Sequence, residues 1–160
     1  MIGITIITVG SLKEDYLKAG VKEYIKRISA YAKLNMIEIS DKSLNKNPSQ
    51  GDIQKVLDQE GLEILKKIKS STFVVTLEID GDMMTSDQFA KFIEHTTTYN
   101  SSEIVFVIGG SWGISREVKQ RSNKSLSLSS MTFPHQLTRM IFLEQLYRAF
   151  TIINNEPYHK

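Results

Sequence analysis

The chain has 160 residues, 41% of them hydrophobic and 24% charged, and a formal net charge of +2. These values predict one globular domain over residues 1–160 and exclude wholesale disorder, while so small a charge does not by itself identify a nucleic-acid binder. The absence of cysteine excludes disulfides and thiolate zinc sites, and we expect no metal. The first ten residues lack the marks of a signal peptide and no apolar stretch is long enough to span a membrane, so we expect a cytoplasmic protein.

The first half of the chain alternates β-rich runs with stretches of helical period, which is typical of an α/β fold. Apolar residues at the spacing of one helix face follow the first run, and a segment rich in Asn, Ser, Lys and Pro precedes the second helical stretch. The predicted elements are, in chain order, a strand at 2–9, a helix from about 12 to 31, a strand at 34–39, a loop at 40–51 and a helix capped by Ser49 and Asp52.

The second half continues this alternation. The predicted elements are a strand at 72–79, a turn at 80–82, a helix capped by Thr85 and Gln88, a strand at 104–108, a short helix at about 115–123, a strand at 125–129 and a helix at about 135–153. Asp80 and Asp82 in the turn are of a type that binds metal, but the further oxygen ligands of a calcium loop are missing at the required offsets.

The last predicted helix is apolar around nearly its whole circumference. Such a helix must be covered on more than one side. One side can pack on the sheet, and in a chain of this length the other most readily meets a second copy of the same helix. We therefore expect a homodimer.

Basic residues gather in the last third of the chain. Between Arg116 and Arg148 there are six of them against two acidic residues, Glu117 and Glu144. Two interpretations remain open: an ordinary mixed surface, or a surface that meets a polyanionic partner.

The stretch "IGGSWG" at residues 108–113 places three glycines directly after a predicted buried strand. The carboxyl ends of strands in an α/β sheet are where ligands usually bind, and glycine lets the backbone come close to one. The spacing matches neither the dinucleotide fingerprint nor the phosphate loop. A tight strand-to-helix turn with no ligand therefore stays as the alternative.

A second loop, residues 127–136, surrounds Met131 and Phe133 with small hydroxyl residues. Such a loop can hold a flat ring between the two apolar side chains while its backbone bonds the ring edge. The alternative is that both side chains belong to the ordinary core. Pro134 and His135 suit the first turn of the last helix.

Charged residues near the end of the chain offer a second candidate site. Glu144 and Arg148 lie four apart, which predicts an intrahelical ion pair, or an arginine held ready for a phosphate or a carbonyl oxygen. The terminal "NNEPYHK" is either a frayed end or a tail that folds over a site, with Tyr158 able to stack on a base and His159 able to titrate near neutrality.

Taken together, "VFVIGGSWG", "SLSLSSMTFPHQLTRMIFLEQLYRAF" and "NEPYHK" closely resemble the bacterial ribosomal RNA large-subunit methyltransferase H family, the pseudouridine N3-methyltransferases. The resemblance extends to "TVGSLKEDYLKAGVKEYIKRI" and "VVTLEIDG" and so covers nearly the whole chain. It implies a SPOUT-type α/β fold with a mostly parallel sheet, a C-terminal trefoil knot and a homodimer paired along the last helices. It also implies S-adenosylmethionine as methyl donor, contacted by Leu77, Gly109, Leu128, Ser129, Ser130, Met131, Thr132 and Phe133.

The substrate implied by the resemblance is pseudouridine 1915 in helix 69 of 23S rRNA, methylated at N3 in the assembled ribosome, with neither DNA nor a membrane as partner. N3 bears a weakly acidic proton between two carbonyls, so the reaction needs positioning, a proton acceptor and neutralisation of developing charge. Our hypothesis for these roles is Arg148, with Tyr158 and His159 reaching in from the partner protomer, and His135 as a second candidate.

The alternative function is a non-catalytic module that docks on ribosomes and holds S-adenosylmethionine without turnover.

Two residues depart from the family pattern. Asp82 stands where a basic residue is expected, which weakens the case for a substrate contact through that turn. Trp112 stands where smaller or polar residues are usual, and we expect it at the rim of the cofactor or substrate site.

Overall fold

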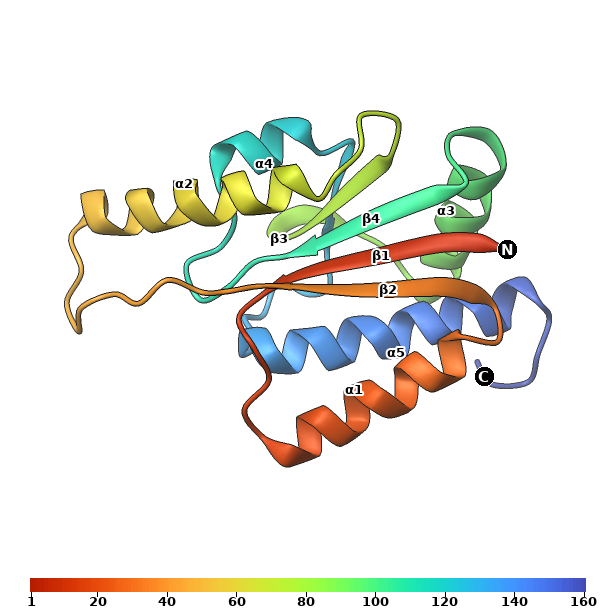
Figure 1. The fold of residues 1–160 in the computed structure, drawn as a ribbon. Helices are drawn as coiled ribbons and strands as arrows, with labels where there is room; N and C mark the ends of the chain where they lie inside the picture. The colour runs from red at the N-terminus through yellow and green to blue at the C-terminus, as the bar shows by residue number, and fades with distance from the viewer.

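A five-stranded parallel sheet forms the centre of the computed structural model, which describes all 160 residues (Figure 1). Its strands are β1 (Ile2–Val9), β2 (Ala32–Ile39), β3 (Phe73–Met83), β4 (Glu103–Ile108) and β5 (Lys124–Ser127), in the order β2-β1-β4-β3-β5. Every neighbouring pair is parallel, so the carboxyl ends of all five strands meet at one edge of the sheet. The predicted α/β architecture is confirmed.

Helices cover both faces of the sheet. They are α1 (Asp15–Ile28), α2 (Gln50–Lys66), α3 (Ser86–Tyr99), α4 (Arg116–Arg121) and α5 (His135–Ile153). Buried residues of α1, α3 and α5 form one apolar cluster with the sheet, and those of α2 and α4 form a second cluster on the opposite face. None of these helices combines the length and the apolar character that crossing a membrane requires.

The central strands are apolar because both of their faces are buried. In β1, Ile4 and Ile6 point into the first cluster, while Ile7 and Val9 point into the second. Every residue of β4 after Glu103 is likewise buried. Near-continuous runs of branched apolar residues are the expected pattern for parallel strands covered by helices on both sides.

Two helix starts follow their predicted caps. Ser49 accepts a hydrogen bond from the Asp52 amide while the Asp52 carboxylate accepts one from the Ser49 amide, both at 3.1 Å. Thr85 and Gln88 make the same reciprocal pair at the start of α3. Each arrangement satisfies amide groups that the first turn of a helix leaves without partners.

The predicted turn at residues 80–82 is wrong, because β3 continues through this segment to Met83. Leu77 and Asp82 both pair with Leu126 of β5, so the residues between them form a bulge and the strand then rejoins its neighbour. Gly81 makes this possible, since a Cβ atom there would lie 2.8 Å from backbone atoms of Leu126. The Asp-Gly-Asp signal for a turn therefore marks a bulge inside a strand.

Helix α5 packs on the sheet and also against α1 and α3, which confirms that it is covered on several sides. Phe142, Leu143, Leu146 and Ala149 are completely buried. A stripe along the remaining side stays only half-buried and includes Leu137, Ile141 and Ile152. Pairing of this stripe with a second copy stays a prediction.

Replacing Phe142 by alanine tests how far the fold depends on this packing. The ring has no exposed surface and lies 4.8 Å from Phe106 and 6.1 Å from Phe89, centroid to centroid. We expect Phe142→Ala to lower the free energy of unfolding by about 3–5 kcal/mol because it leaves a cavity. Urea unfolding at fixed protein concentration measures this, with the exposed Tyr99→Ala as control. A loss no larger than that of the control would contradict the assignment.

Candidate functional site

A cavity of about 550 Å³ opens at the carboxyl edge of the sheet. The bulged part of β3 forms one wall, the ends of β4 and β5 with the segments that follow them form two more, and the first turn of α5 forms the fourth. Its size is that of a small-molecule site. The residues that line it are Leu77 to Asp80, Ile108 to Ser111, Gly113, Ile114, Lys119, Leu126 to Ser129, Met131 to His135 and Thr138.

The glycine loop between β4 and α4 folds back on itself. The Gly113 amide donates to the Gly110 carbonyl at 3.1 Å, and Gly113 has φ +92°, a conformation that favours glycine. A Cβ atom on Gly109 would meet the Gly113 carbonyl and would lie 2.7 Å from its carbon. Glycine at 109 is therefore required by the close approach of the two ends of the loop, a reason that sequence reasoning did not supply.

Seven of the eight residues for which the resemblance implies cofactor contact line this cavity: Leu77, Gly109, Leu128, Ser129, Met131, Thr132 and Phe133. The eighth, Ser130, is exposed and points its hydroxyl toward the Met83 sulfur, 4.0 Å away. Met131 is 75% exposed and Phe133 is half-buried, so the alternative that both are ordinary core is wrong. The Ser129 hydroxyl accepts the Met131 amide at 3.0 Å and stabilises the loop in this shape.

The cavity combines three kinds of surface. Apolar side chains from all three strands can cover a flat ring, and Ser129 and Thr132 offer hydroxyl groups. Glu78 and Asp80 add carboxylates, of which Glu78 already pairs with Lys119 at 3.4 Å. These groups suit a small molecule with an aromatic ring, hydroxyl groups and a positive charge.

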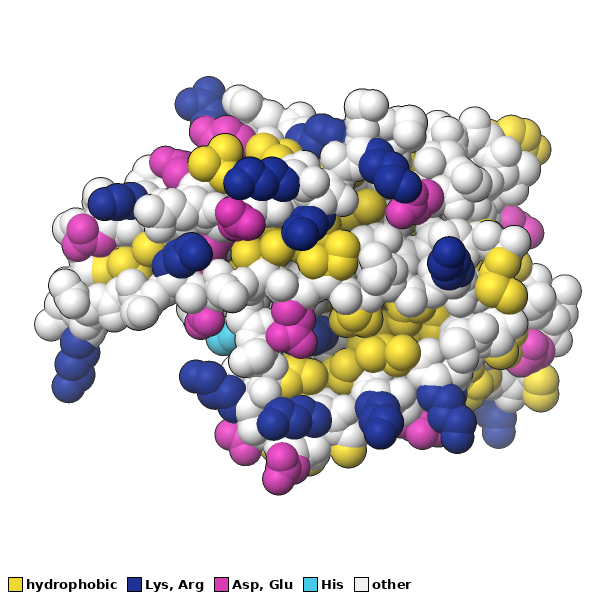
Figure 2. Space-filling view, in the orientation of Figure 1, with side chains coloured by type: hydrophobic (Ala, Val, Ile, Leu, Met, Phe, Trp, Pro, Cys, Tyr) yellow, Lys and Arg dark blue, Asp and Glu magenta, His cyan; other side chains and the backbone are white.

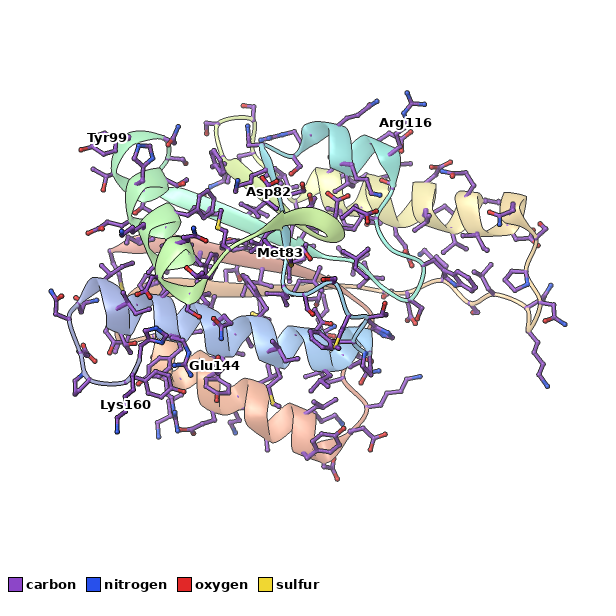
Figure 3. All side chains as sticks on the ribbon, turned by 180° about the vertical axis from the view of Figure 1, so that it is seen from behind. Asp82, Met83, Tyr99, Arg116, Glu144 and Lys160 are labelled. Carbon is purple, nitrogen blue, oxygen red and sulfur yellow. The ribbon has the colours of Figure 1, made fainter.

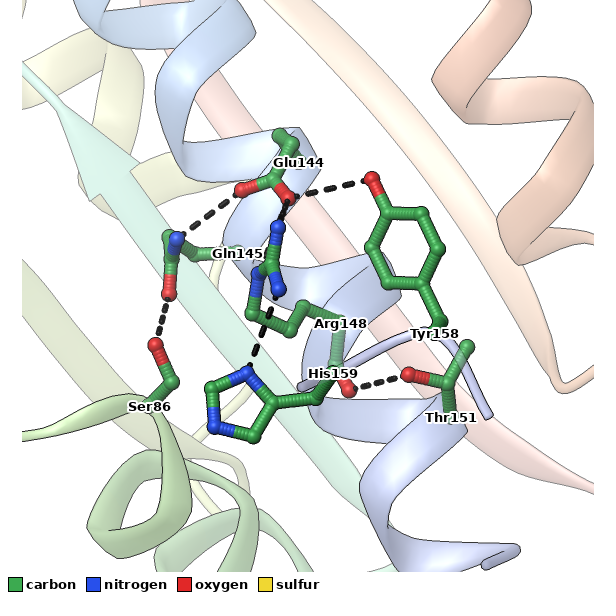
Figure 4. A network of polar contacts seen from close by, with 7 residues as sticks. All are labelled: Ser86, Glu144, Gln145, Arg148, Thr151, Tyr158 and His159. Atoms are coloured by element: carbon green, nitrogen blue, oxygen red, sulfur yellow. Dashed lines mark hydrogen bonds and ion pairs between the residues drawn. The ribbon is translucent and has the colours of Figure 1, made fainter. Parts of the chain in front are cut away.

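A polar network occupies the other end of α5 (Figure 4). Arg148 Nε donates to Glu144 Oε1 at 3.0 Å, and Arg148 Nη1 lies 3.2 Å from His159 Nδ1. The Tyr158 hydroxyl donates to the same Glu144 oxygen at 3.2 Å, and its ring lies 4.7 Å from the Arg148 guanidinium carbon. The predicted ion pair is confirmed, and the terminal residues fold onto the helix.

The pKa values of Arg148 and Tyr158 keep the polar network intact at neutral pH. The hydrogen bond from Arg148 to Glu144 raises the pKa of the guanidinium, which stays charged. Burial, followed by the nearby Glu144 charge, raises the pKa of Tyr158 to about 12, so the phenol stays protonated and acts as a donor. His159 Nε2 also lies 3.5 Å from Asp87 Oδ2.

The tail is fastened at a second point. Tyr31, at the corner between α1 and β2, donates its hydroxyl to Glu156 Oε2 at 2.6 Å. That hydrogen bond, with burial as a smaller cause, raises the pKa of Tyr31 to about 12. The tail consequently turns back along α5, and Lys160 ends close to the helix that carries Glu144 (Figure 3).

Comparison with known proteins decides the family. A family model described as "Predicted SPOUT methyltransferase" matches residues 2–159. The chain belongs to this family. It is 52% identical to the ribosomal RNA large subunit methyltransferase H of Bacillus cytotoxicus, and 51% and 50% identical to the proteins of that name from Bacillus thuringiensis and Carboxydothermus hydrogenoformans. Each match covers 98% of this chain and 99% of the relative.

Within one chain of this SPOUT methyltransferase, the four catalytic candidates are not brought together. His135 lines the cavity, with Nδ1 3.5 Å from the Ser111 hydroxyl, whereas Arg148, Tyr158 and His159 form the network farther along α5. At 1.5 Å of rise per residue, the 13 residues from His135 to Arg148 span about 20 Å. None of Glu144, Arg148, Tyr158 and His159 lines the cavity of the same chain.

Sequence reasoning missed several lining residues of the methyltransferase cavity. Ile79 and Asp80 follow Leu77 in the bulge of β3. The pattern had placed Ile79 at the end of a strand and Asp80 in a turn. Thr138 lies one helical turn beyond His135, and this spacing is a usable signal for residues that share a helix face. Ser111 stood in the glycine loop without a stated role.

The two departures from the family pattern lie outside the cavity lining. Asp82 pairs with Lys124 Nζ at 3.0 Å, which joins β3 to β5 beyond the bulge. Trp112 is 49% exposed and lies between Ser111 and Gly113, which both line the cavity. Its position next to the rim agrees with the expectation, while contact with a ligand stays a prediction.

The Gly109→Ala substitution tests the loop geometry of this methyltransferase. Because the added methyl meets the backbone of Gly113, we expect the variant to lose about 1–3 kcal/mol of unfolding free energy. Gly51→Ala is the matched control, since a Cβ atom in this first turn of α2 would make only an ordinary contact, 3.8 Å from Ser49 Oγ, and alanine favours helix. Thermal unfolding of the two variants and the wild type measures the effect, and equal midpoints for both variants would refute this account.

Proposed function

We propose that the protein transfers a methyl group from S-adenosylmethionine to N3 of pseudouridine 1915 in helix 69 of 23S rRNA, as a cytoplasmic homodimer acting on the assembled ribosome. The observation that carries the proposal is the cavity, in which residues from three separate chain segments that the family resemblance implies for the cofactor come together. The SPOUT family match and relatives of about 50% identity that are named ribosomal RNA large subunit methyltransferase H support it.

The residues of the cavity fit S-adenosylmethionine. Leu77, Leu128 and Phe133 would cover its adenine, and the hydroxyl groups of the loop after β5 would bond its polar atoms. Glu78 or Asp80 would face positive charge on the amino group or the sulfur. Bound S-adenosylmethionine supplies an electrophilic methyl group on a cationic sulfur, and the protein must bring N3 in line with it.

The polar network supplies what the nucleobase needs. As N3 loses its proton, negative charge spreads over the two flanking carbonyl oxygens, and the Arg148 guanidinium is suited to neutralise it. Glu144 fixes that guanidinium in place, and Tyr158, a neutral donor, can bond a carbonyl oxygen. His159, 3.2 Å from Arg148, and His135 on the cavity wall are the candidates to accept the proton.

A homodimer solves the separation of cavity and network. Two α5 helices paired antiparallel about a two-fold axis near their middle would bring Arg148, Tyr158 and His159 of one chain toward the cavity of the other. The half-buried side of α5, with Leu137, Ile141 and Ile152 and with Glu144 and Arg148 between them, provides the surface for that pairing. The trefoil knot implied by the family would place the loops after β4 and β5 in their close contact around the cavity.

A labelling experiment tests the function. The protein is mixed with tritiated S-adenosylmethionine and with ribosomes that lack this methyl group, and the label is mapped. We expect label at N3 of the helix 69 pseudouridine. Binding of the cofactor without transfer would instead indicate the non-catalytic ribosome-docking module, and transfer to another nucleotide would refute the proposed target.

Single-turnover methylation tests the roles in the network. With cofactor and ribosomes saturating, we expect Arg148→Ala and His159→Ala each to lower the rate by about 100-fold or more, because charge neutralisation and proton transfer each contribute factors of that order. Tyr158→Phe should cost less, since it removes one neutral hydrogen bond. The exposed Tyr99→Ala, outside both the cavity and the network, is the control and should keep the wild-type rate. Unchanged rates in both Arg148→Ala and His159→Ala would overturn the assignment.

A further inference from the structure

The basic residues between Arg116 and Arg148 are largely engaged inside the protein. Lys119 pairs with Glu78, Lys124 with Asp82, and Arg148 with Glu144. Arg121 donates to carbonyls of the segment before β3, and the buried Arg139 donates to the Gly10 carbonyl at 3.0 Å. Of the six, only Arg116 has no such partner, so little of the positive charge in this region is unpaired.

Free positive charge gathers instead on α1. Lys18, Lys22 and Lys26 are exposed and take part in no ion pair. They are spaced four residues apart, so they form one row along the outer side of the helix, here called the lysine ridge. Figure 2 shows dark blue side chains along the lower edge of the molecule, where α1 lies in Figure 1. Arg27, at the end of the helix, is held by Glu23 at 3.0 Å.

The fold does not require this row. Helix α1 buries Leu17, Val21 and Ile28 on the opposite side, and the lysines contribute nothing to that contact. Like charges at a spacing of four residues repel and destabilise a helix by a few tenths of a kcal/mol per pair. Glu14 and Asp15 lie near the start of the row and Glu23 is engaged by Arg27, so the Lys22 and Lys26 ammonium groups are not neutralised.

We propose that the lysine ridge binds the phosphate backbone of an RNA strand. Four residues of helix rise by about 6 Å, so the three ammonium groups are spaced at intervals close to those between neighbouring phosphates along a strand. A membrane surface fits less well, because binding there needs several large apolar side chains on the same face, and the exposed part of α1 offers only Tyr16 beside Ala19. Even spacing of point charges is suited to a regular polyanion.

The lysine ridge lies on α1, which borders the polar network. Tyr24 on α1 is 6.3 Å from Tyr147 on α5, and Tyr147 is 4.8 Å from Tyr158 in the tail. The helix that carries the ridge therefore packs, through its inner side, against the residues proposed to receive the target base. This inference rests on the proposed function, which it deepens by assigning the surface that contacts RNA outside the cavity.

Salt dependence of RNA binding tests the ridge. The triple variant Lys18→Gln, Lys22→Gln and Lys26→Gln is compared with a control in which Lys55, Lys67 and Lys91, exposed and scattered over other elements, are changed to Gln. Both variants lose three charges. Binding of a labelled hairpin of 23S rRNA is measured between 50 and 200 mM salt. Since each phosphate contact in single-stranded RNA contributes about 0.7 to the slope of log K against log salt, the ridge variant should lose about 2 from this slope.

The control should keep the wild-type slope, and both variants should keep the wild-type affinity for S-adenosylmethionine, which shows that they are folded. An unchanged slope in the ridge variant, or an equal loss in the control, would overturn the proposal. The proposal would also be overturned if the ridge variant bound RNA like the wild type but had lost binding to anionic phospholipid vesicles. Failure of the wild type to methylate ribosomes would refute the proposed function instead. If the wild type methylates ribosomes, and the ridge variant keeps both the wild-type slope and the wild-type KM for ribosomes, only the ridge proposal is refuted.

Discussion

The burial of α5 against the sheet is the contact on which both halves of the candidate site depend. Phe142, Leu143 and Leu146 hold the middle of this helix in the largest apolar cluster, between α1 and α3. Its first turn carries His135 into the cavity wall, and its second half, from Glu144 at the middle to Arg148, carries the polar network. A rigid rod about 28 Å long thus fixes how far apart the two groups of residues lie.

With that spacing, the proposed chemistry requires two chains. The cavity holds the elements that suit the methyl donor, and the network holds those that suit the base, but a single chain keeps them apart. Pairing of two copies of α5 through their half-buried sides would bring the cavity of one chain and the network of the other together into one complete site. In such an arrangement, dissociation of the dimer would abolish activity even though each chain stayed folded, because neither half is sufficient.

Local signals in the sequence predicted most of the fold. The capping pairs at Ser49 and Thr85 and the apolar strands were identified because each depends on residues close in the chain. The strand after Asp80 was missed, since a bulge is defined by pairing with Leu126 and a tripeptide cannot reveal it. The reason for Gly109 was also missed, because the carbonyl it must accommodate becomes its neighbour only when the loop closes. Likewise, the partners of Lys119 and Lys124 lie on β3, so composition alone overstated the free charge of the C-terminal region.

The hydrogen bond from Tyr31 to Glu156 joins residues 125 positions apart and ties the tail to the corner after α1. Ordering a flexible terminus only when the substrate arrives would cost conformational entropy at each turnover, and this bond moves that cost into the folding of the chain. If His159 has the proposed role, the corner takes part in positioning it without lining the cavity. Natural variation at position 31 would then change turnover through the disorder of the tail, a route that inspection of the cavity alone would not reveal.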